Sequence, residues 1–301
     1  MTRDDSLARA HVARKRFGQH FLHDQNVLRH LVEVIAPKPT DRLIEIGPGE
    51  GALTLPLLRA CGQMTAIELD RDLIESLAAR AASVGELRII SADVLTVDLT
   101  GIAQSGLPLR IGPSRPSMAS GALGLLPSAL APLRIVGNLP YNISTPILFH
   151  CLEHAGVIRD MHFMLQKEVV ERMAAPPGSK VYGRLSVMLQ LRCTVDPLFE
   201  VPPTAFRPPP KVDSAIVRLT PLPTGELPSV DMSLVGRVVR AAFGQRRKTL
   251  SNALRDVATP GQIEAAGIDP RARAEQLAPA AFVALAKIIT ANGGGDAACA
   301  R

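Results

Sequence analysis

The fold of this chain is decided by the stretch Arg42-Leu43-Ile44-Glu45-Ile46-Gly47-Pro48-Gly49-Glu50-Gly51. Its first five residues are mostly apolar and predict a strand, and residues 52–59 behind the glycines predict a helix. Three glycines at alternate positions permit a tight turn, which lets the backbone come close to a ligand at a helix amino terminus. The stretch therefore predicts a strand, a ligand-binding loop and a helix in direct succession.

The spacing of the glycines bears on the kind of ligand. A dinucleotide site would carry the pattern G-x-G-x-x-G after its strand. Here the third glycine comes one residue earlier, and an acid, Glu45, precedes the first. This combination is more typical of S-adenosylmethionine sites, where no pyrophosphate has to be held. A turn without a ligand remains the alternative for this motif taken alone.

Strands and helices alternate beyond this loop. Strands are predicted over residues 64–69 and 87–91, with a helix over 73–82 between them. Such alternation indicates a parallel sheet covered on both faces, an α/β fold of the Rossmann-like kind. Alternating apolar and polar residues over 212–219 predict an antiparallel strand that closes the sheet. We expect one domain over 1–221 and a small, mainly helical, carboxy-terminal domain over 226–301.

Two acids stand at the ends of successive predicted strands. Glu68 ends the second strand, and Asp93 follows the third. A carboxylate at the first position can accept both ribose hydroxyl hydrogens of a nucleoside cofactor, and one at the second can accept from an adenine amine. Each acid alone also fits a loop cap. Together with the glycine loop they predict a binding site at one edge of the sheet, and acids there suit a sulfonium cation.

The residues Asn138-Leu139-Pro140-Tyr141 end a further apolar strand, 133–137. An amide, a carbonyl before a proline-fixed turn and an aromatic ring lie within one turn of chain. Together they can hold a planar amine-bearing base, with acceptors for its N–H groups and a face for stacking. An ordinary strand-to-helix turn is the alternative reading of these four residues.

Composition limits the class of protein. The net charge of +6 and a pI near 9.4 favour an anionic partner such as nucleic acid. The four cysteines are too far apart in sequence to form a zinc site or a redox pair, and they indicate a reducing cytoplasm. No signal peptide is recognisable, and the uncharged run 116–133 is too polar and too rich in proline for a membrane helix. We expect no metal and no membrane contact.

Two further segments have competing interpretations. Residues 101–132 are rich in glycine, proline and serine and predict an inserted loop, either solvated or able to touch an anion. The segment 237–255 carries basic residues and no acid, and is either a solvated helix face or an RNA-contacting surface. The candidate RNA-binding residues in it are Arg237, Arg240, Arg246, Arg247 and Lys248.

Five motifs follow one another along the chain. They are Phe17-Gly18-Gln19-His20-Phe21-Leu22, residues 45–51, Ile67-Glu68-Leu69-Asp70, residues 138–144 and Phe206-Arg207-Pro208-Pro209-Pro210-Lys211-Val212-Asp213-Ser214. In this order they resemble the motifs of the ribosomal RNA adenine dimethyltransferase family, over roughly residues 14–290. The resemblance is strongest to its bacterial small-subunit (16S) branch, which is linked to kasugamycin sensitivity. It implies a class I methyltransferase sheet and S-adenosylmethionine as the cofactor.

The resemblance also implies roles for single residues. The target adenine would lie between Tyr141 and Phe206, although a hydrophobic plug is the alternative for Phe206. Asparagine is more usual in the family at the position of His20, so this contact departs from the pattern. The expected cofactor contacts are His20, Leu22, Gly47, Gly49, Glu68, Asp93 and Asn138, and the expected catalytic residues are Asn138, Leu139, Pro140, Tyr141 and Phe206.

The expected reaction is dimethylation of the N6 amine of two adjacent adenosines in the 3′-terminal hairpin of 16S ribosomal RNA. The protein would act as a monomer on the immature small ribosomal subunit in the cytoplasm. Two alternatives remain open: a large-subunit adenine methyltransferase of the macrolide-resistance type, and a ribosome-assembly factor that acts mainly by binding. Mapping the modified nucleotides separates the first from the expected reaction.

Overall fold

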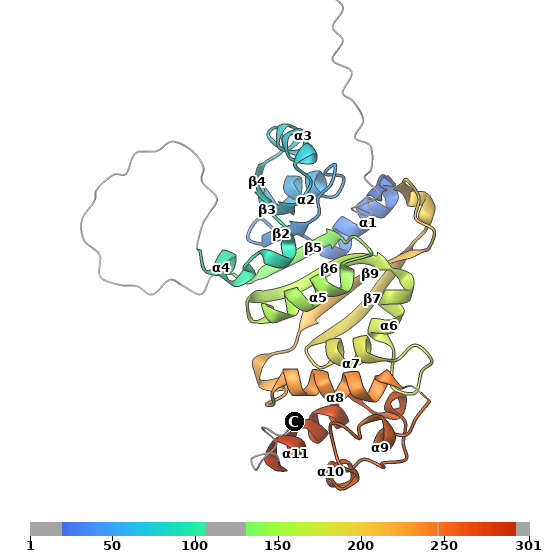
Figure 1. The fold of residues 1–301 in the computed structure, drawn as a ribbon. Helices are drawn as coiled ribbons and strands as arrows, with labels where there is room; N and C mark the ends of the chain where they lie inside the picture. The colour runs from blue at the N-terminus through green and yellow to red at the C-terminus, as the bar shows by residue number, and fades with distance from the viewer. Residues whose placement is uncertain (1–19, 106–130, 246, 293–301) are drawn as a thin grey trace, which may run out of the picture. The chain divides into compact units, whose positions relative to one another are not determined.

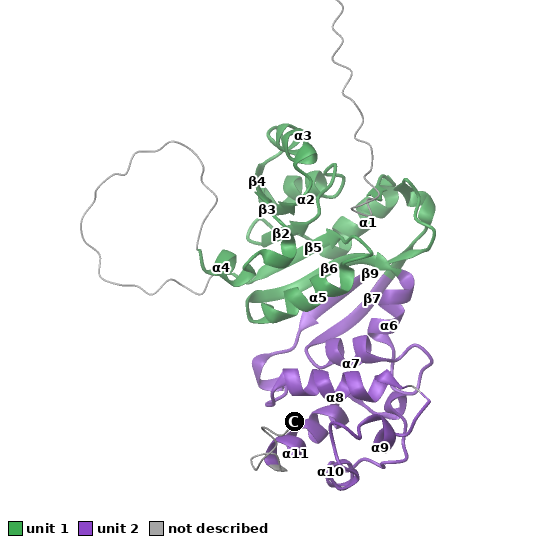
Figure 2. Cartoon of the chain, in the orientation of Figure 1, with its two compact units in different colours: residues 1–166, 199–216 green, residues 167–198, 217–301 purple. Residues whose placement is uncertain are grey.

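The computed structural model describes residues 20–105, 131–245 and 247–292. Phe17 to Gln19, most of the glycine-rich loop and Arg246 therefore lie outside the described residues. The chain divides into two compact units (Figure 2). The first comprises residues 1–166 and 199–216, and the second residues 167–198 and 217–301.

A seven-stranded sheet forms the framework of the fold, in the order β4-β3-β2-β5-β6-β9-β7 (Figure 1). The pairs β3–β4, β2–β3, β2–β5 and β5–β6 are parallel, so their carboxyl ends meet at one edge. The sheet is mixed, as the predicted class I arrangement requires. The strand expected to close it over 212–219 is β9, but β9 lies between β6 and β7, so β7 forms that edge of the sheet instead. The strands are β2 Arg42–Ile46, β3 Gln63–Glu68, β4 Glu86–Ser91, β5 Leu133–Asn138, β6 Ile158–Gln166, β7 Cys193–Val201 and β9 Ser214–Pro221.

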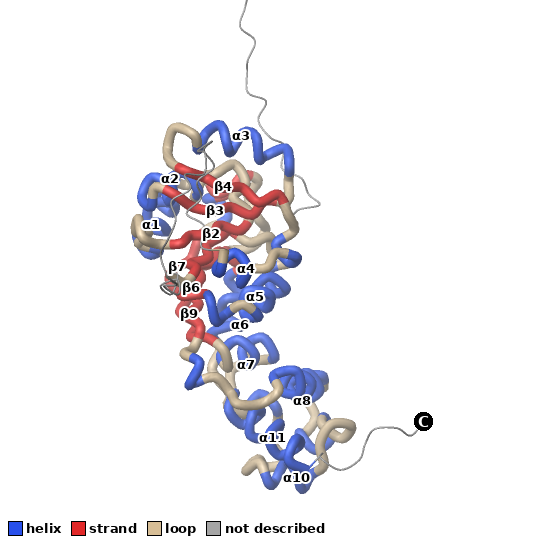
Figure 3. The backbone as a smooth tube through the Cα atoms, turned by 90° about the vertical axis from the view of Figure 1, so that its left-hand side faces the viewer, coloured by secondary structure: helices blue, strands red, loops and turns tan. Residues whose placement is uncertain are grey.

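Helices cover both faces of the parallel strands. In the first unit, α1 and α2 lie on one side of these strands and α4 and α5 on the other (Figure 3). The central strands are buried on both faces, which explains their nearly continuous apolar sequences. The helices of this unit are α1 Gln25–Ile35, α2 Thr54–Cys61, α3 Arg71–Ala81, α4 Leu99–Gln104 and α5 Ser144–Glu153.

The first helix shows how the local sequence sets its boundaries. The Asp24 side chain accepts hydrogen bonds from the backbone of Asn26 and Val27, which satisfies two donors of the first turn. The helix buries Leu28, Leu31 and Ile35. It ends at Ile35, before Pro37, which cannot donate a helical hydrogen bond. Residues 20–22 are thereby held next to the sheet by a helix with its own buried face.

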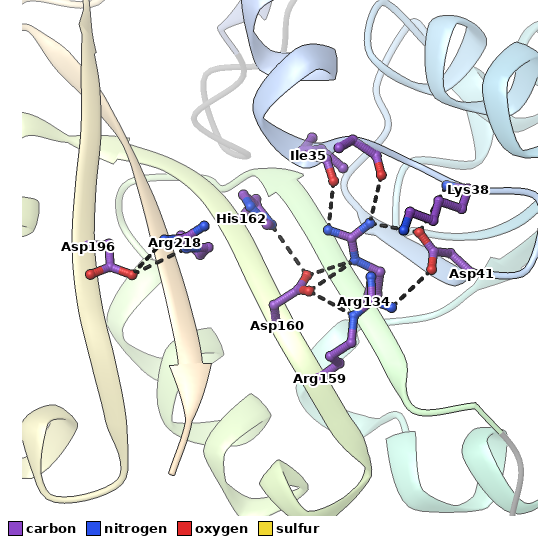
Figure 4. A network of polar contacts seen from close by, with 10 residues as sticks. Ile35, Lys38, Asp41, Arg134, Arg159, Asp160, His162, Asp196 and Arg218 are labelled. Atoms are coloured by element: carbon purple, nitrogen blue, oxygen red, sulfur yellow. Dashed lines mark hydrogen bonds and ion pairs between the residues drawn. The ribbon is translucent and has the colours of Figure 1, made fainter.

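An ion network fixes the sheet at the end opposite the glycine loop (Figure 4). Arg134, 5% exposed, donates to Asp160 over 2.9 Å and to Asp41 over 2.7 Å, and also to the backbone of Ile35. Burial alone would raise the pKa of Asp160, but the nearby His162 ring and the hydrogen bonds and charge of Arg134 outweigh it and lower that pKa. The network therefore joins the end of α1 to the start of β5 and β6.

The start of the predicted loop 101–132 differs from the expectation. Residues 99–104 form α4, which buries Leu99 and Ala103. The sequence did not predict this helix, because six residues are too few to show a helical period of apolar residues. Residues 106–130 lie outside the described part of the chain.

The second unit has a helical core of its own. Its helices bury Tyr182, Val187, Val235 and Phe282 in one cluster. The segments 167–174 and 184–190, expected to belong with the sheet domain, are part of the second unit: 184–190 contacts the carboxy-terminal helices, and 167–174 contacts 184–190. The helices of this unit are α6 Lys167–Ala174, α7 Arg184–Gln190, α8 Met232–Gly244, α9 Leu250–Ala253, α10 Pro260–Ala265 and α11 Pro279–Asn292.

Candidate active site

A cavity of about 340 Å³ opens at the carboxyl edge of the parallel strands. The ends of β2, β3 and β5 and the residues after β4 all contribute to its wall. It brings together ten of the residues singled out in the sequence. These are His20, Leu22, Gly47, Gly49, Glu68, Asp93, Asn138, Leu139, Pro140 and Tyr141.

The glycine loop forms one wall of this cavity. Gly47, Gly49 and Gly51 all have positive φ angles, which side chains rarely adopt. At Gly49 a Cβ atom would also lie 3.1 Å from the Phe21 ring. The backbone N–H of Gly49 donates to Oε2 of Glu68 over 3.1 Å. The glycines thus allow the loop to pass close beneath residue 21 and to face the carboxylate of β3.

The two strand-end acids are both held by backbone donors. Glu68 Oε1 accepts from the Asp70 N–H over 2.8 Å, so each oxygen of this carboxylate has one backbone partner. Each oxygen keeps a further lone pair for a ligand hydroxyl. Burial raises the pKa of Glu68 in spite of these bonds. Asp93 accepts from the Leu95 N–H through Oδ1 over 3.0 Å, the loop-cap bond that the sequence left open.

The Asn138 loop presents acceptors to the same cavity. The Asn138 side-chain amide donates to the backbone oxygen of His20 over 2.8 Å, which leaves its Oδ1 as an acceptor. The Pro140 carbonyl accepts from Ile143, whereas the Leu139 carbonyl accepts no hydrogen bond from the described residues. The Leu139 side chain is buried and anchors the loop. Two acceptors, Oδ1 of Asn138 and the Leu139 carbonyl, therefore remain for an amine.

Tyr141 supplies an aromatic ring beside these acceptors. Its hydroxyl lies 2.5 Å from the Ser214 hydroxyl, and its ring is stacked with that of His20 at a centroid distance of 5.8 Å. Burial raises the pKa of the Tyr141 phenol, against the hydrogen bond with Ser214. The phenol therefore stays neutral. Ser214 holds its hydroxyl, and His20 packs against its ring.

Phe206 is the candidate residue that the cavity does not include. It begins the short strand β8, Phe206–Arg207, which pairs with β1, Phe21–Leu22. Its side chain is 2% exposed. A base can reach this ring only if its surroundings move, so its stacking role stays a prediction and the alternative of a hydrophobic plug stays open.

The charged side chains that line the cavity indicate the kind of ligand that it can bind. Among the described residues, its wall includes carboxylates but no lysine or arginine, and one apolar side chain in it, Leu69, is 51% exposed. A positively charged ligand with an apolar or aromatic part fits such a wall, since the acids attract the charge and Leu69 can cover a ring. S-adenosylmethionine has both properties. The lining acids are Glu45, Glu50, Glu68, Asp70 and Asp93.

Glu45, the acid of the glycine motif, also lines the cavity. It is 2% exposed, and its Oε2 has no hydrogen-bond partner among the described residues. Burial raises the pKa of Glu45 to about 7, and the nearby charge of Glu68 acts in the same direction. In the sequence, only its place two residues before the first glycine pointed to it. The burial that perturbs it is a property of the fold.

We expect Glu45 to make stability depend on pH. Its folded-state pKa lies above the unfolded value of 4.5, so the folded protein binds more protons between these two values. The stability that the protonated Glu45 carboxyl contributes is fully present below pH 4.5 and is lost as pH rises to about 7. The free energy of unfolding falls by about 3 kcal/mol over this range. Glu45→Gln should therefore gain stability relative to the parent between pH 5 and pH 8. Denaturant unfolding at the two pH values measures this.

The exposed Glu33 provides the matched control for this experiment. Glu33→Gln should change stability equally at both pH values. If Glu45→Gln shows no greater relative gain at pH 8 than Glu33→Gln, the carboxyl of Glu45 is not perturbed as described.

The strand order and an acidic cavity at the ends of the parallel strands define a class I, S-adenosylmethionine-dependent methyltransferase. Comparison with protein families agrees: a model described as ribosomal RNA adenine dimethylase matches residues 10–291. The chain belongs to this family. It is an S-adenosylmethionine-dependent ribosomal RNA adenine dimethyltransferase.

Relatives and solved structures support this assignment. A ribosomal RNA small subunit methyltransferase A of Xylella fastidiosa is 56% identical over 91% of this chain and 95% of its own length. One of Xanthomonas campestris is 55% identical over 92% and 96%. A Plasmodium falciparum dimethyladenosine transferase shares the fold, with TM-score 0.69 and 23% identity over 91% and 98%. The 23S rRNA methyltransferase ErmE does so with 0.64 and 24% over 90% and 99%.

Two further features of the described chain concern metals and membranes. No group of three or more His, Cys, Asp or Glu side chains within residues 20–105, 131–245 and 247–292 is arranged to hold a metal ion. No helix in these ranges has the length and apolar character that a membrane crossing demands. The thiols of Cys61, Cys151 and Cys193 are free and buried, and burial raises the pKa of Cys151 to about 12.

Proposed function

We propose that this enzyme dimethylates the N6 amine of two adjacent adenosines in the 3′-terminal hairpin of small-subunit ribosomal RNA. The observation that carries the proposal is the pair of free acceptors, Asn138 Oδ1 and the Leu139 carbonyl, beside the Tyr141 ring in the cofactor cavity. The choice of the small subunit rests on the relatives, which are named for that RNA and cover nearly the whole chain.

The two acceptors act on the nucleophile. The adenine amine is a poor nucleophile, because its lone pair is delocalised into the ring. Hydrogen bonds from its two N–H groups to Asn138 Oδ1 and the Leu139 carbonyl would favour a pyramidal nitrogen whose lone pair is directed at the donor. S-adenosylmethionine supplies a methyl group on a sulfonium, which is a good leaving group. Positioning of this kind lowers barriers by roughly 7–11 kcal/mol.

Stacking and proton transfer complete the proposed mechanism. Tyr141 would stack on the extruded adenine, which offsets part of the cost of unstacking it, at about 1–3 kcal/mol per base. The phenol is not needed as a base, since its raised pKa keeps its proton near neutrality. The amine proton becomes acidic once the methyl group has been transferred and can pass to water. The same acceptors serve the second transfer through the N–H that remains.

The basic segment of the second unit supports binding to the RNA backbone. Helix α8 buries a stripe that includes Val235 and Val239, and Arg237 and Arg240 are exposed on its other side. Arg247 and Lys248, which follow the helix, are also exposed. Exposed cations spaced along a helix and its end can follow a phosphate backbone. We assign RNA binding to residues 226–301 and methyl transfer to 1–221.

Replacing Arg237 and Arg240 with glutamine should weaken RNA binding and reduce its dependence on salt. Each lost phosphate contact should lower the slope of log K against log salt by roughly one. Binding titrations at several salt concentrations measure that slope. Arg59→Gln, an exposed arginine in α2, is the control and should leave it unchanged. An unchanged slope in the double variant would show that these residues form a solvated face.

The partner and the location follow from the same proposal. The substrate would be 16S ribosomal RNA within the immature small ribosomal subunit, which places the enzyme in the cytoplasm. We propose that it acts there as a monomer.

The proposal is tested with purified protein, labelled S-adenosylmethionine and ribosomal particles from cells that lack the modification. Immature small subunits should receive up to four methyl groups, two on each of two neighbouring adenosines, and large subunits none. Mass spectrometry of nuclease fragments locates them. Methylation of large-subunit RNA alone would assign the enzyme to the macrolide-resistance type instead.

A further inference from the structure

The side chain of His20 is directed at the base-holding part of the site. Its Nδ1 lies 2.8 Å from the carbonyl oxygen of Pro208, and its ring is stacked with Tyr141 at an interplanar angle of 28°. The carbonyl can only accept, so Nδ1 carries the proton and donates it. Both polar and apolar contacts of this imidazole are therefore made to residues outside the glycine loop and the strand-end acids.

The segment that contains Pro208 is fastened to residues 20–23 along its length. The strands β1 and β8 pair, with Leu22 opposite Phe206, and the His23 N–H donates to the Ala205 carbonyl over 2.9 Å. The bond from His20 to Pro208 extends this two-stranded ribbon by one side-chain contact. The segments 20–23 and 205–208 thus form a strap along the cavity wall, and His20 is part of it.

Tyr141 is connected to the same segment by two routes. Its hydroxyl meets that of Ser214, and its ring meets His20, which is bonded to Pro208. The backbone oxygen of His20 also accepts from the Asn138 side chain over 2.8 Å. His20 therefore contacts the Tyr141 ring, the Asn138 side-chain amide and the segment 205–214.

We propose that His20 is a positioning residue that backs one face of the Tyr141 ring and leaves the other face for the target adenine. The proposal rests on the stacking role of Tyr141 proposed above. It gives the imidazole a role towards the base, whereas the family resemblance implied a contact with the methyl donor. Asparagine in the same place can form the bond to Pro208 but has no ring with which to stack, so the histidine adds a contact.

The test separates base positioning from donor binding. His20→Asn removes the ring, and His20→Phe keeps a ring but removes the bond to Pro208. We expect each to lower kcat/KM for the RNA by about tenfold, with the Kd for S-adenosylmethionine within twofold of the parent. Calorimetry gives the Kd, and turnover of small subunits gives kcat/KM. An equal loss of donor affinity in both variants would overturn the proposal.

A second readout does not depend on catalysis. The chain has two tyrosines, Tyr141 and Tyr182, so a protein labelled with ¹³C on its tyrosine rings shows two sets of signals. Tyr141→Phe assigns them. His20→Asn should shift the Tyr141 signals through the loss of the neighbouring ring and leave those of the buried Tyr182 in place. Unmoved Tyr141 signals would refute the stacking contact, whether or not the variant keeps its turnover.

Tyr141→Ala distinguishes failure of this inference from failure of the proposed function. If that variant keeps full RNA turnover, the stacking role of Tyr141 is wrong. If it loses turnover while the His20 variants keep theirs, the base is held by Tyr141 without help from His20.

Discussion

Asn138→Ala should lower the rate of methyl transfer by about a hundredfold to a thousandfold. The side chain provides one of two acceptors for the adenine amine, and loss of a single preorganised hydrogen-bonding group commonly costs this much. Its other end donates to the His20 backbone, so the substitution also frees one contact of the strap. Single-turnover methylation of small subunits, with donor and RNA saturating, measures the chemical step.

Asn142→Ala is the matched control, because Asn142 is exposed in the same loop and lines the same cavity. It should stay within about threefold of the parent, as surface truncations usually do. A rate for Asn138→Ala equal to that of the control would show that the amide does not hold the amine.

Glu68→Gln should weaken S-adenosylmethionine binding by about a hundredfold. The carboxylate has a free lone pair on each oxygen for the ribose hydroxyls, and hydrogen bonds to charged groups contribute about 1.5–3 kcal/mol each. Glutamine also places its NH₂ group against the N–H of either Gly49 or Asp70, so one of these two backbone donors then faces another donor. Calorimetric titration of the purified protein with the donor gives the Kd.

The demethylated product separates two explanations for such a loss. S-adenosylhomocysteine has the same ribose but no sulfonium charge, so it should lose affinity by a similar factor if Glu68 binds the hydroxyls. A loss confined to the charged donor would show that Glu68 acts through its charge instead. Glu75→Gln, an exposed acid in α3, should affect neither ligand.

The residues of the cavity could be predicted because their signals are local. Gly47 and Gly49, Glu68, Asp93 and Asn138 each follow a strand, and parallel strands bring their carboxyl ends to one edge of a sheet. The spacing of strands and glycines therefore implied that these side chains meet. The direction of each side chain was not implied.

The remainder depends on contacts between segments far apart in the chain. Phe206 is buried because β8 pairs with β1, and His20 reaches Pro208 across 188 residues. Glu45 has a raised pKa chiefly because the completed sheet excludes water from it, and the charge of Glu68 on the neighbouring strand adds to this. Helices α6 and α7 join the second unit through their apolar faces, a choice of partner that their own sequences do not specify.

We propose that the Asn138 loop holds adenines of small-subunit ribosomal RNA while the enzyme methylates them. This is tested most directly by mass-spectrometric mapping of that RNA from cells that lack this protein and are complemented with the parent or with Asn138→Ala. We predict two adjacent dimethyladenosines near the 3′ end with the parent and unmodified adenosines with an equally abundant variant. Full dimethylation by the variant, or none by the parent, would contradict the claim.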